Sequence, residues 1–187
     1  MTSSYGTRVE PEAVAAALSG LRARLGVIAV LGNHDWWNDG PRMASALAQS
    51  GIVVLEDGVQ RLEHAGGEFY VVGLADQMTR PKRIAEALAL VPEGKPLLLL
   101  VHEPDVFAEL DGRPVLTLAG HTHGGQVLIP FLGRPIVPSA FGQRFAAGHV
   151  VEGDRHMFVT TGVGTSIWPI RLGVPPELVM LTLRSAP

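Results

Sequence analysis

Four short runs of consecutive apolar residues, each followed by glycine or a polar side chain, constrain the fold of this chain most. The runs span residues 27–31, 52–55, 96–101 and 115–119. Apolar runs of this length are typical of strands buried on both faces of a sheet. The segment before the first run carries Val14, Leu18 and Leu21 at helical spacing. Alternating strands and helices predict an α/β fold.

The remaining pattern refines this prediction. We expect helices at 11–25, 43–49 and 81–90, a hairpin made by 59–63 and 69–73, and short strands at 147–152, 157–161 and 178–183. The strands after residue 127 are expected to form a second, mainly antiparallel sheet packed on the first. The predicted architecture is a layered α-β-β-α sandwich of two mixed sheets flanked by helices. We expect residues 1–10 to be a disordered tail and residues 11–187 to be a single domain.

Composition excludes several classes of protein. The chain has 187 residues, of which 47% are hydrophobic and 18% charged, as expected for one compact domain. It lacks cysteine, so any metal must be held by histidine, asparagine or carboxylates. No lysine- or arginine-rich run supports binding to nucleic acid or an anionic membrane. No apolar stretch approaches the roughly 18 residues that span a bilayer, and no signal peptide is visible. As written, the chain is expected to be cytoplasmic.

Three polar patches follow the apolar runs and share the residue types of a metal site. They are Gly32-Asn33-His34-Asp35, His102, and the block Gly120-His121-Thr122-His123-Gly124-Gly125. Open α/β sheets bind ligands beyond the carboxyl ends of their strands, so these patches are expected to converge. The amide oxygen of Asn33 and the imidazoles of His102 and His121 suit divalent metals.

Two further histidines extend the predicted site. His123, two residues beyond His121, could serve the same metal in a turn or a second metal in an extended loop. His34 next to Asp35 suits a general acid that protonates a leaving alkoxide.

Each patch alone has an ordinary structural interpretation. A histidine at a strand end is often only hydrogen-bonded, and Gly-Asn-His-Asp could be a polar turn. The order of the three patches, each after an apolar run, favours the metal site. By contrast, His64 and His149 are expected to be surface residues, and Arg144 and Arg171 to face solvent or form salt bridges.

With these residues, the chain resembles the calcineurin-like metallophosphoesterases, and most of all a bacterial phosphodiesterase branch with a Gly-His-Thr-His-Gly-Gly-Gln block. The resemblance extends over residues 11–184 and includes the segments 161–166 and 171–177. It implies two divalent metal ions, with manganese, iron and zinc all compatible. Asn33, His102 and His121 would hold the second metal and His123 the first. His34 would be the general acid, with Asp35 beside it.

The resemblance breaks off before Asn33. The family's Asp-x-His and Gly-Asp motifs, which supply two ligands and the bridging aspartate, do not occur there. We therefore expect that the fold's first strands are missing and that an upstream segment encodes them. We also expect this chain alone to be poorly soluble or weakly active, and an anchor or export signal could precede it. Asp154-Arg155-His156 matches Asp-x-His but lies between strand-like runs, so it is interpreted as a hairpin turn.

Three functional hypotheses follow. The leading one is a metal-dependent phosphoesterase, with a phosphodiester as its expected substrate, acting on a small-molecule or lipid-linked phosphoester. The second is a non-catalytic binding module on the same fold. The third is a hydrolase with a single metal held by Asn33, His102 and His121, for which Asp76 is the one candidate carboxylate. Substrate, metal identity and oligomeric state stay open.

Overall fold

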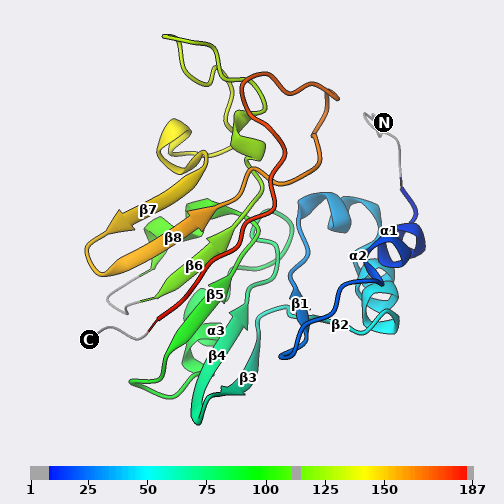
Figure 1. Ribbon diagram of the computed structural model, residues 1–187, viewed down its shortest axis with the longest axis vertical. Helices are drawn as coiled ribbons and strands as arrows, with labels where there is room; N and C mark the ends of the chain where they lie inside the picture. The colour runs from blue at the N-terminus through cyan, green and yellow to red at the C-terminus, as the bar shows by residue number, and fades with distance from the viewer. Residues whose placement is uncertain (1–8, 111–114, 185–187) are drawn as a thin grey trace.

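A six-stranded mixed sheet forms the larger part of the computed structural model, which describes residues 9–110 and 115–184 (Figure 1). Its strand order is β3-β4-β5-β6-β8-β7. The strands are β3 (Gly58–His64), β4 (Gly67–Gly73), β5 (Leu97–Leu100), β6 (Leu116–Ala119), β7 (Gly148–Glu152) and β8 (Arg155–Val159). The central strands β4, β5, β6 and β8 run parallel, while β3 and β7 are antiparallel edges. The predicted α/β class is confirmed.

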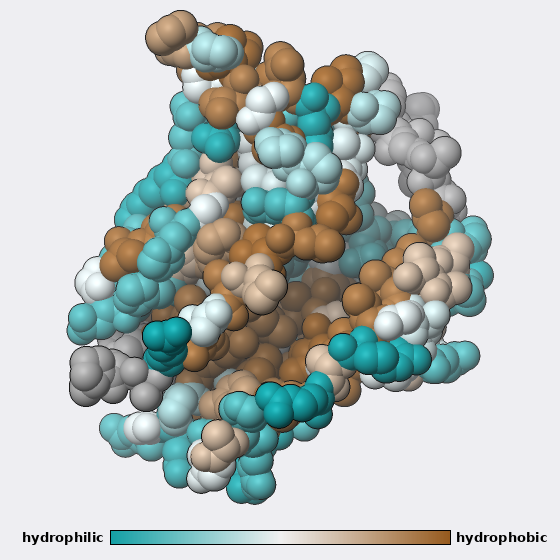
Figure 2. Space-filling model, in the orientation of Figure 1, coloured by the Kyte–Doolittle hydropathy of each residue, from teal (hydrophilic) through white to brown (hydrophobic). Residues whose placement is uncertain are grey.

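A smaller unit packs beside this sheet. Strands β1 (Val27–Ala29) and β2 (Ile52–Val54) pair in parallel, and helices α1 (Pro11–Leu18) and α2 (Asn33–Gln49) lie against them. Leu31, Met43 and Leu47 are buried in the core between these elements. Figure 2 shows hydrophobic side chains gathered in a hollow between this unit and the large sheet.

The main core lies on one face of the large sheet. Leu99, Met157 and Phe107 have exposed fractions of zero, and burial of such a side chain contributes about 1.5–3 kcal/mol. Helix α3 (Ile84–Ala89) and the 3-10 helix η1 (Pro104–Glu109) cover this face. Two further 3-10 turns, η2 (His123–Gly125) and η3 (Gly142–Phe145), follow β6. This core holds the strands rigidly, so their carboxyl ends form a fixed edge.

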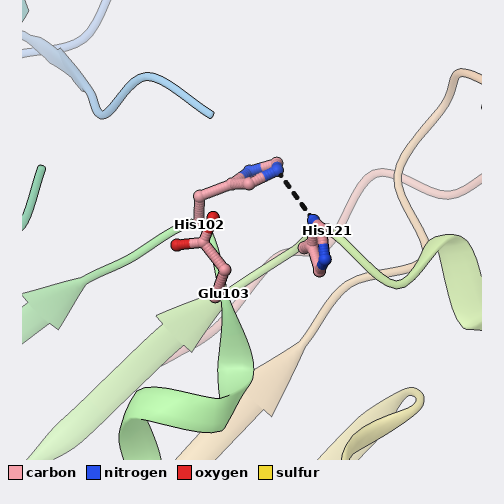
Figure 3. Close-up of side chains that lie close together, drawn as sticks. All are labelled: His102, Glu103 and His121. Atoms are coloured by element: carbon pink, nitrogen blue, oxygen red, sulfur yellow. Dashed lines mark hydrogen bonds between the residues drawn. The ribbon is translucent and has the colours of Figure 1, made fainter. Parts of the chain in front are cut away.

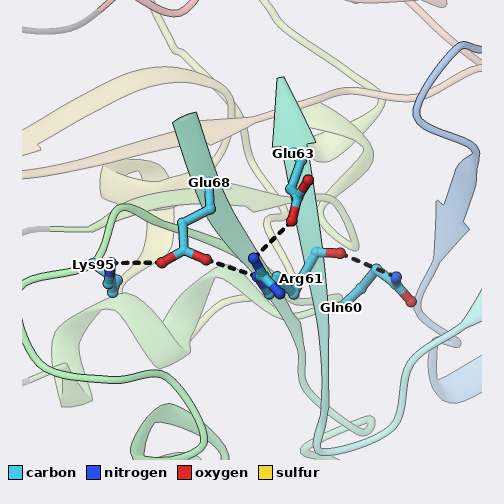
Figure 4. Close-up of polar contacts among 5 residues, drawn as sticks. All are labelled: Gln60, Arg61, Glu63, Glu68 and Lys95. Atoms are coloured by element: carbon cyan, nitrogen blue, oxygen red, sulfur yellow. Dashed lines mark hydrogen bonds and ion pairs between the residues drawn. The ribbon is translucent and has the colours of Figure 1, made fainter. Parts of the chain in front are cut away.

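The hairpin β3–β4 confirms the predicted pairing of 59–63 with 69–73. Arg61 forms ion pairs with Glu63 and Glu68, and Glu68 also binds Lys95 (Figure 4). These side chains are largely exposed, so each pair is worth roughly 0–1 kcal/mol. The cluster lies at the turn end of the hairpin and not at the edge where the polar patches lie.

The prediction that the strands after residue 127 form a separate sheet is wrong, because they belong to the large sheet. The expected strands at 147–152 and 157–161 form β7 and β8, but β8 pairs with β6 in the large sheet. The open edge of β6 satisfies the backbone groups of β8, so no separate sheet is needed. The segment 178–183 is not a strand, and it crosses the face of the sheet instead (Figure 1). The turn between β7 and β8 falls at residues 153–154, so the expected hairpin turn at 154–156 is right for Asp154, whereas Arg155 and His156 belong to β8.

The helices also differ in length from the prediction. Helix α1 ends at Leu18, where the Ser19 hydroxyl donates to the carbonyl of Ala16 and competes with the helical pattern. Helix α2 begins at Asn33, ten residues before the predicted start, and bends at Asp39. No helix among the described residues has the length and apolarity to span a bilayer. Most of the expected disordered tail lies outside the described residues.

Candidate metal centre

Three of the predicted ligands converge at the carboxyl edge of the sheet. Asn33 is the first residue of α2, while His102 follows β5 and His121 follows β6. The Nε2 atom of His102 lies 3.1 Å from the Oδ1 atom of Asn33 and 3.2 Å from the Nδ1 atom of His121. Figure 3 shows the two rings pointing toward each other. Residues separated by up to 88 positions in the chain thus form one cluster.

The spacing of these atoms fits a shared metal ion. Nitrogen ligands about 2.1 Å from a tetrahedral metal lie roughly 3.4 Å from each other, close to the spacing observed here. Asn33 is buried, so few water molecules can reach its side-chain carbonyl oxygen and compete with a metal ion for it. A cluster of neutral nitrogen and oxygen donors suits manganese, iron and zinc.

Burial keeps the imidazoles uncharged. Burial and, second, the neighbouring His121 together lower the pKa of His102 to about 4. The pKa of His121 is also lowered, first by burial and then by His123. Both rings are therefore neutral near pH 7, the form in which histidine binds metals.

Glu103 adds a carboxylate that sequence reasoning missed. Ligand atoms of His102, Glu103 and His121 all lie within 4.8 Å of one another (Figure 3). Glu103 is buried, its Oε2 atom accepts the N–H of Gln77, and its Oε1 atom has no hydrogen-bond partner. A buried carboxylate oxygen without a donor needs either a proton, as in a pair of neighbouring acids, or a cation beside it. Its position directly after His102 was the available signal.

Asp76 is a second buried carboxylate next to Glu103. It is fully buried, and its Oδ2 atom accepts from the backbone and hydroxyl of Thr79, while its Oδ1 atom has no partner. Burial and, second, the neighbouring Asp76 together raise the pKa of Glu103 to about 8. The two acids thus form a buried pair, and Asp76, the carboxylate expected for a single-metal site, contributes through Glu103.

His34 and His123 face a different segment. The Nε2 atom of His34 lies 3.3 Å from the hydroxyl of Ser166, and the Nδ1 atom of His123 lies 3.2 Å from the carbonyl of Gly164. Because Nδ1 of His123 donates to that carbonyl, Nε2 carries the lone pair and is free to bind a metal. Burial lowers the pKa of His123.

Asp35 caps the helix that presents Asn33 and His34. Its Oδ2 atom accepts the backbone N–H of Gly32 at 2.9 Å, which stabilises the start of α2. Burial raises the pKa of Asp35, whereas this hydrogen bond lowers it. Gly32 itself is required by packing, since a Cβ atom there would lie 2.5 Å from the ring of His102.

The His-Thr-His-Gly-Gly block is bent into a strained turn. His121 and His123 have φ angles of +66° and +50°, a left-handed region that L-residues rarely adopt. Gly124 is also left-handed, and a Cβ atom there would lie 2.7 Å from Thr161. Such strain costs about 1–3 kcal/mol per residue and concentrates at functional sites.

Arg171 holds the segment that contacts His34 and His123. Its guanidinium donates to the carbonyls of Thr161, Gly162 and Gly164, and also to that of Val174. The expected solvent or salt-bridge role of Arg171 is therefore wrong, because five hydrogen bonds to backbone carbonyls occupy its donors. Arg144, by contrast, forms the expected salt bridge, with Glu152.

Three known proteins that the chain resembles are named as metallophosphoesterases or phosphodiesterases. The chain is 34% identical over 177 residues to the uncharacterized metallophosphoesterase YkuE of Bacillus subtilis, covering 93% of this chain and 62% of that protein. It is 34% identical over 162 residues to the phosphodiesterase YaeI of Escherichia coli, covering 83% and 57%. An uncharacterized metallophosphoesterase of Aquifex aeolicus is 30% identical over 179 residues, covering 91% and 66%.

The chain belongs to the calcineurin-like metallophosphoesterases. It spans about 60% of the length of the curated relatives it matches. No protein-family model matches the chain, and no solved structure matches it either. The converging imidazoles and the free carboxylate oxygen of Glu103 fit the metal dependence that the family name states.

Proposed function

We propose that this chain carries a divalent metal centre of a phosphodiesterase, built from Asn33, His102, Glu103 and His121. The observation that supports this most is the contact of His102 Nε2 with both Asn33 and His121, beside the unpartnered Oε1 atom of Glu103. When bound, the metal would supply a Lewis acid and a water of lowered pKa. His123, whose Nε2 atom is free, is proposed as a ligand of a second ion.

The chain's own residues would divide the remaining work. His34 sits at the start of α2, one residue from Asn33, and Ser166 orients its ring through Nε2. From there it would donate a proton to the leaving alkoxide, a contribution of typically 10²–10⁴-fold in rate. Asp35 positions this histidine by capping the helix, and Arg171 positions the segment that carries Ser166.

A phosphodiester is proposed as the substrate because of the relative's name. The Escherichia coli relative is a phosphodiesterase, and a small-molecule or lipid-linked phosphoester would meet the same metal centre. A cavity of about 360 Å³ beside His121 and Glu103 provides room for part of such a substrate. Lys82 also lines this cavity, and although its ammonium pairs with Glu109, it has further N–H donors for a phosphoryl oxygen.

Hydrolysis of a bis-aryl phosphodiester with added Mn²⁺ tests the proposal. The 187-residue chain should turn this substrate over, and His121→Ala should abolish turnover while His64→Ala, on the exposed end of β3, should not. Absence of hydrolysis together with tight Mn²⁺ binding would favour the non-catalytic module. One tightly bound ion per chain with full activity would favour the single-metal hydrolase.

A further inference from the structure

Two loops lie side by side above the metal centre and join it to an exposed surface. We refer to residues 127–141 and 163–172 as the two rim loops. The N–H of Leu128 donates to the carbonyl of Leu172 at 2.7 Å, and Gln126 Nε2 donates to the carbonyl of Trp168 at 3.2 Å. Figure 1 shows both loops at the top of the molecule, beyond the carboxyl edge of the sheet.

Large apolar side chains cover the tips of these loops. Ile136, Trp168 and Ile167 expose 76%, 66% and 64% of their surface, and Phe131 is fully exposed. Figure 2 shows hydrophobic side chains at the top of the molecule over these loops. Single exposed apolar residues are ordinary, but a group of them on neighbouring loops marks an interaction surface. We call Phe131, Leu132, Ile136, Ile167, Trp168 and Ile170 the apolar rim.

Backbone strain holds two members of the rim outward. Phe131 and Ile167 have φ angles of +66° and +64°. A β-branched residue such as isoleucine is a genuine outlier in this region. Since neither side chain gains burial in return, the strained conformation gives these residues no packing advantage within the chain. Strain of this kind is typical of functional segments.

The charge around the rim is opposite to that of the whole chain. The chain has a net charge of −3, yet no aspartate or glutamate occurs in residues 121–151 or 155–176. The two charged residues of the rim loops are Arg134 and Arg171. Asp105, from η1, accepts hydrogen bonds from Ser139 and Ala140 and places one anion against the rim loops, where Arg134 and Arg171 outnumber it. An apolar surface with a net positive charge behind it complements an anionic lipid surface.

Contacts between backbone and side chains connect the rim to the catalytic residues. Arg134 Nε donates to the carbonyl of Gly124 at 2.9 Å, within the His-Thr-His-Gly-Gly turn. In the other rim loop, Gly164 accepts from His123 and Ser166 contacts His34. A surface on which the rim rests would therefore lie next to the proposed general acid.

We propose that the apolar rim docks on a lipid bilayer containing anionic phospholipids, so that phosphoester head groups enter the metal centre from the membrane. Trp168 suits the interface, where an amphipathic ring lies between acyl chains and head groups. Ile167 and Phe131 would insert beside it, while the positive charge of Arg134, whose Nε atom donates to Gly124, would attract the phosphates. The identity of the substrate class rests on the proposed function, but docking itself requires no turnover.

Cosedimentation of the 187-residue chain with vesicles tests the docking. The vesicles are phosphatidylcholine alone or with about one third phosphatidylglycerol, and the anionic vesicles should bind more chain, with the excess lost at high salt. The double variants Ile167→Ser/Trp168→Ser and Phe131→Ser/Leu132→Ser should each weaken binding about tenfold or more. The matched control is Leu90→Ser, at the end of α3, whose side chain is 50% exposed and lies outside the rim.

Fluorescence gives a second readout. Vesicles should shift the tryptophan emission to the blue, and Trp168→Phe should remove most of that shift while the chain still binds. Equal binding by wild type and both double variants would overturn the proposal, as would absence of binding to either vesicle. Concentration-dependent self-association that the same double variants abolish, without vesicle binding, would assign the rim to a second copy of the chain. Hydrolysis of the soluble phosphodiester is measured separately, so loss of docking and loss of catalysis are distinguishable.

Discussion

The Nδ1 atom of His121 lies 3.2 Å from the Nε2 atom of His102, and burial lowers the pKa of both rings. Both rings are neutral, so the two facing nitrogen atoms can share only one hydrogen bond, in which one donates and the other accepts. A divalent cation between them would instead accept a lone pair from each nitrogen. The relationship therefore leads directly to a prediction about metal affinity.

Replacement of His121 by alanine should weaken metal binding strongly. We expect Mn²⁺ affinity to fall by more than about 100-fold, since loss of an outer-shell partner alone typically costs 10–100-fold. Isothermal titration of the metal-free chain measures this change. His149→Ala on β7, where His149 contacts His156, is the matched control and should bind Mn²⁺ as the wild type does. Unchanged affinity in His121→Ala would remove His121 from the centre.

Replacement of His34 by asparagine should separate catalysis from metal binding. We expect kcat for a phosphodiester to fall about 10²–10⁴-fold because the proton donor to the leaving group is lost. Affinity for Mn²⁺ should stay within error of the wild type, because His34 Nε2 contacts Ser166 and not the ligand cluster. A parallel loss of metal binding would instead make His34 a ligand.

Gly32→Ala should disturb the site through packing. A Cβ atom at Gly32 would lie 2.5–2.7 Å from three atoms of the His102 ring, so the ring must move away from Asn33. We expect Mn²⁺ affinity to fall at least about tenfold, as for an outer-shell lesion. Gly20→Ala is the control, since nothing lies within 4 Å of its added Cβ atom. Equal affinity in both variants would show that the ring tolerates displacement.

Glu103 should make the stability of the metal-free chain depend on pH. Its pKa is raised from 4.5 to about 8 in the folded chain, so the folded state binds more protons between these values. This stabilisation is present below pH 4.5 and is lost as the pH rises toward 8. His102, His121 and His123, whose pKa values are lowered in the folded chain, act in the opposite direction while the unfolded histidines lose their protons around pH 6.5. The contribution of Glu103 is therefore the difference between wild type and Glu103→Gln.

Urea unfolding of wild type and Glu103→Gln between pH 6.5 and 8 tests this dependence. Relative to the variant, the wild type should lose stability as the pH rises, because glutamine does not titrate. Parallel profiles would mean that Glu103 is ionised in the folded chain throughout.

Arg171→Lys should lower kcat by displacing the segment that carries Ser166. A lysine ammonium cannot replace a planar guanidinium that donates to four backbone carbonyls at once. We expect kcat to fall at least about tenfold, because a small misplacement of a catalytic group can cost as much as 10²-fold. Arg22→Lys, whose bonds go to carbonyls at the end of α1, should leave kcat unchanged. A pure rise in KM would indicate a direct contact with substrate instead.

Local patterns determined the α/β class and the main ligand candidates. Each strand that bears a ligand is a run of apolar residues, and the residue after it was predicted to face the site because strand ends meet at one edge. That reasoning placed Asn33, His102 and His121 together, and in the structure His102 lies within hydrogen-bonding distance of both Asn33 and His121. It also identified a hairpin turn at Asp154, although Arg155 and His156 belong to β8.

Only the tertiary structure decided which strands share a sheet and what surrounds the ligands. Strand β8 joins β6 because an open parallel edge satisfies its backbone, a choice that periodicity cannot reveal. Glu103 and Arg171 gain their proposed roles from burial and from groups distant in the chain, a carboxyl for Glu103 and backbone carbonyls for Arg171, which local spacing does not reveal. The residue types of a metal site are local, whereas desolvation and convergence are properties of the folded chain.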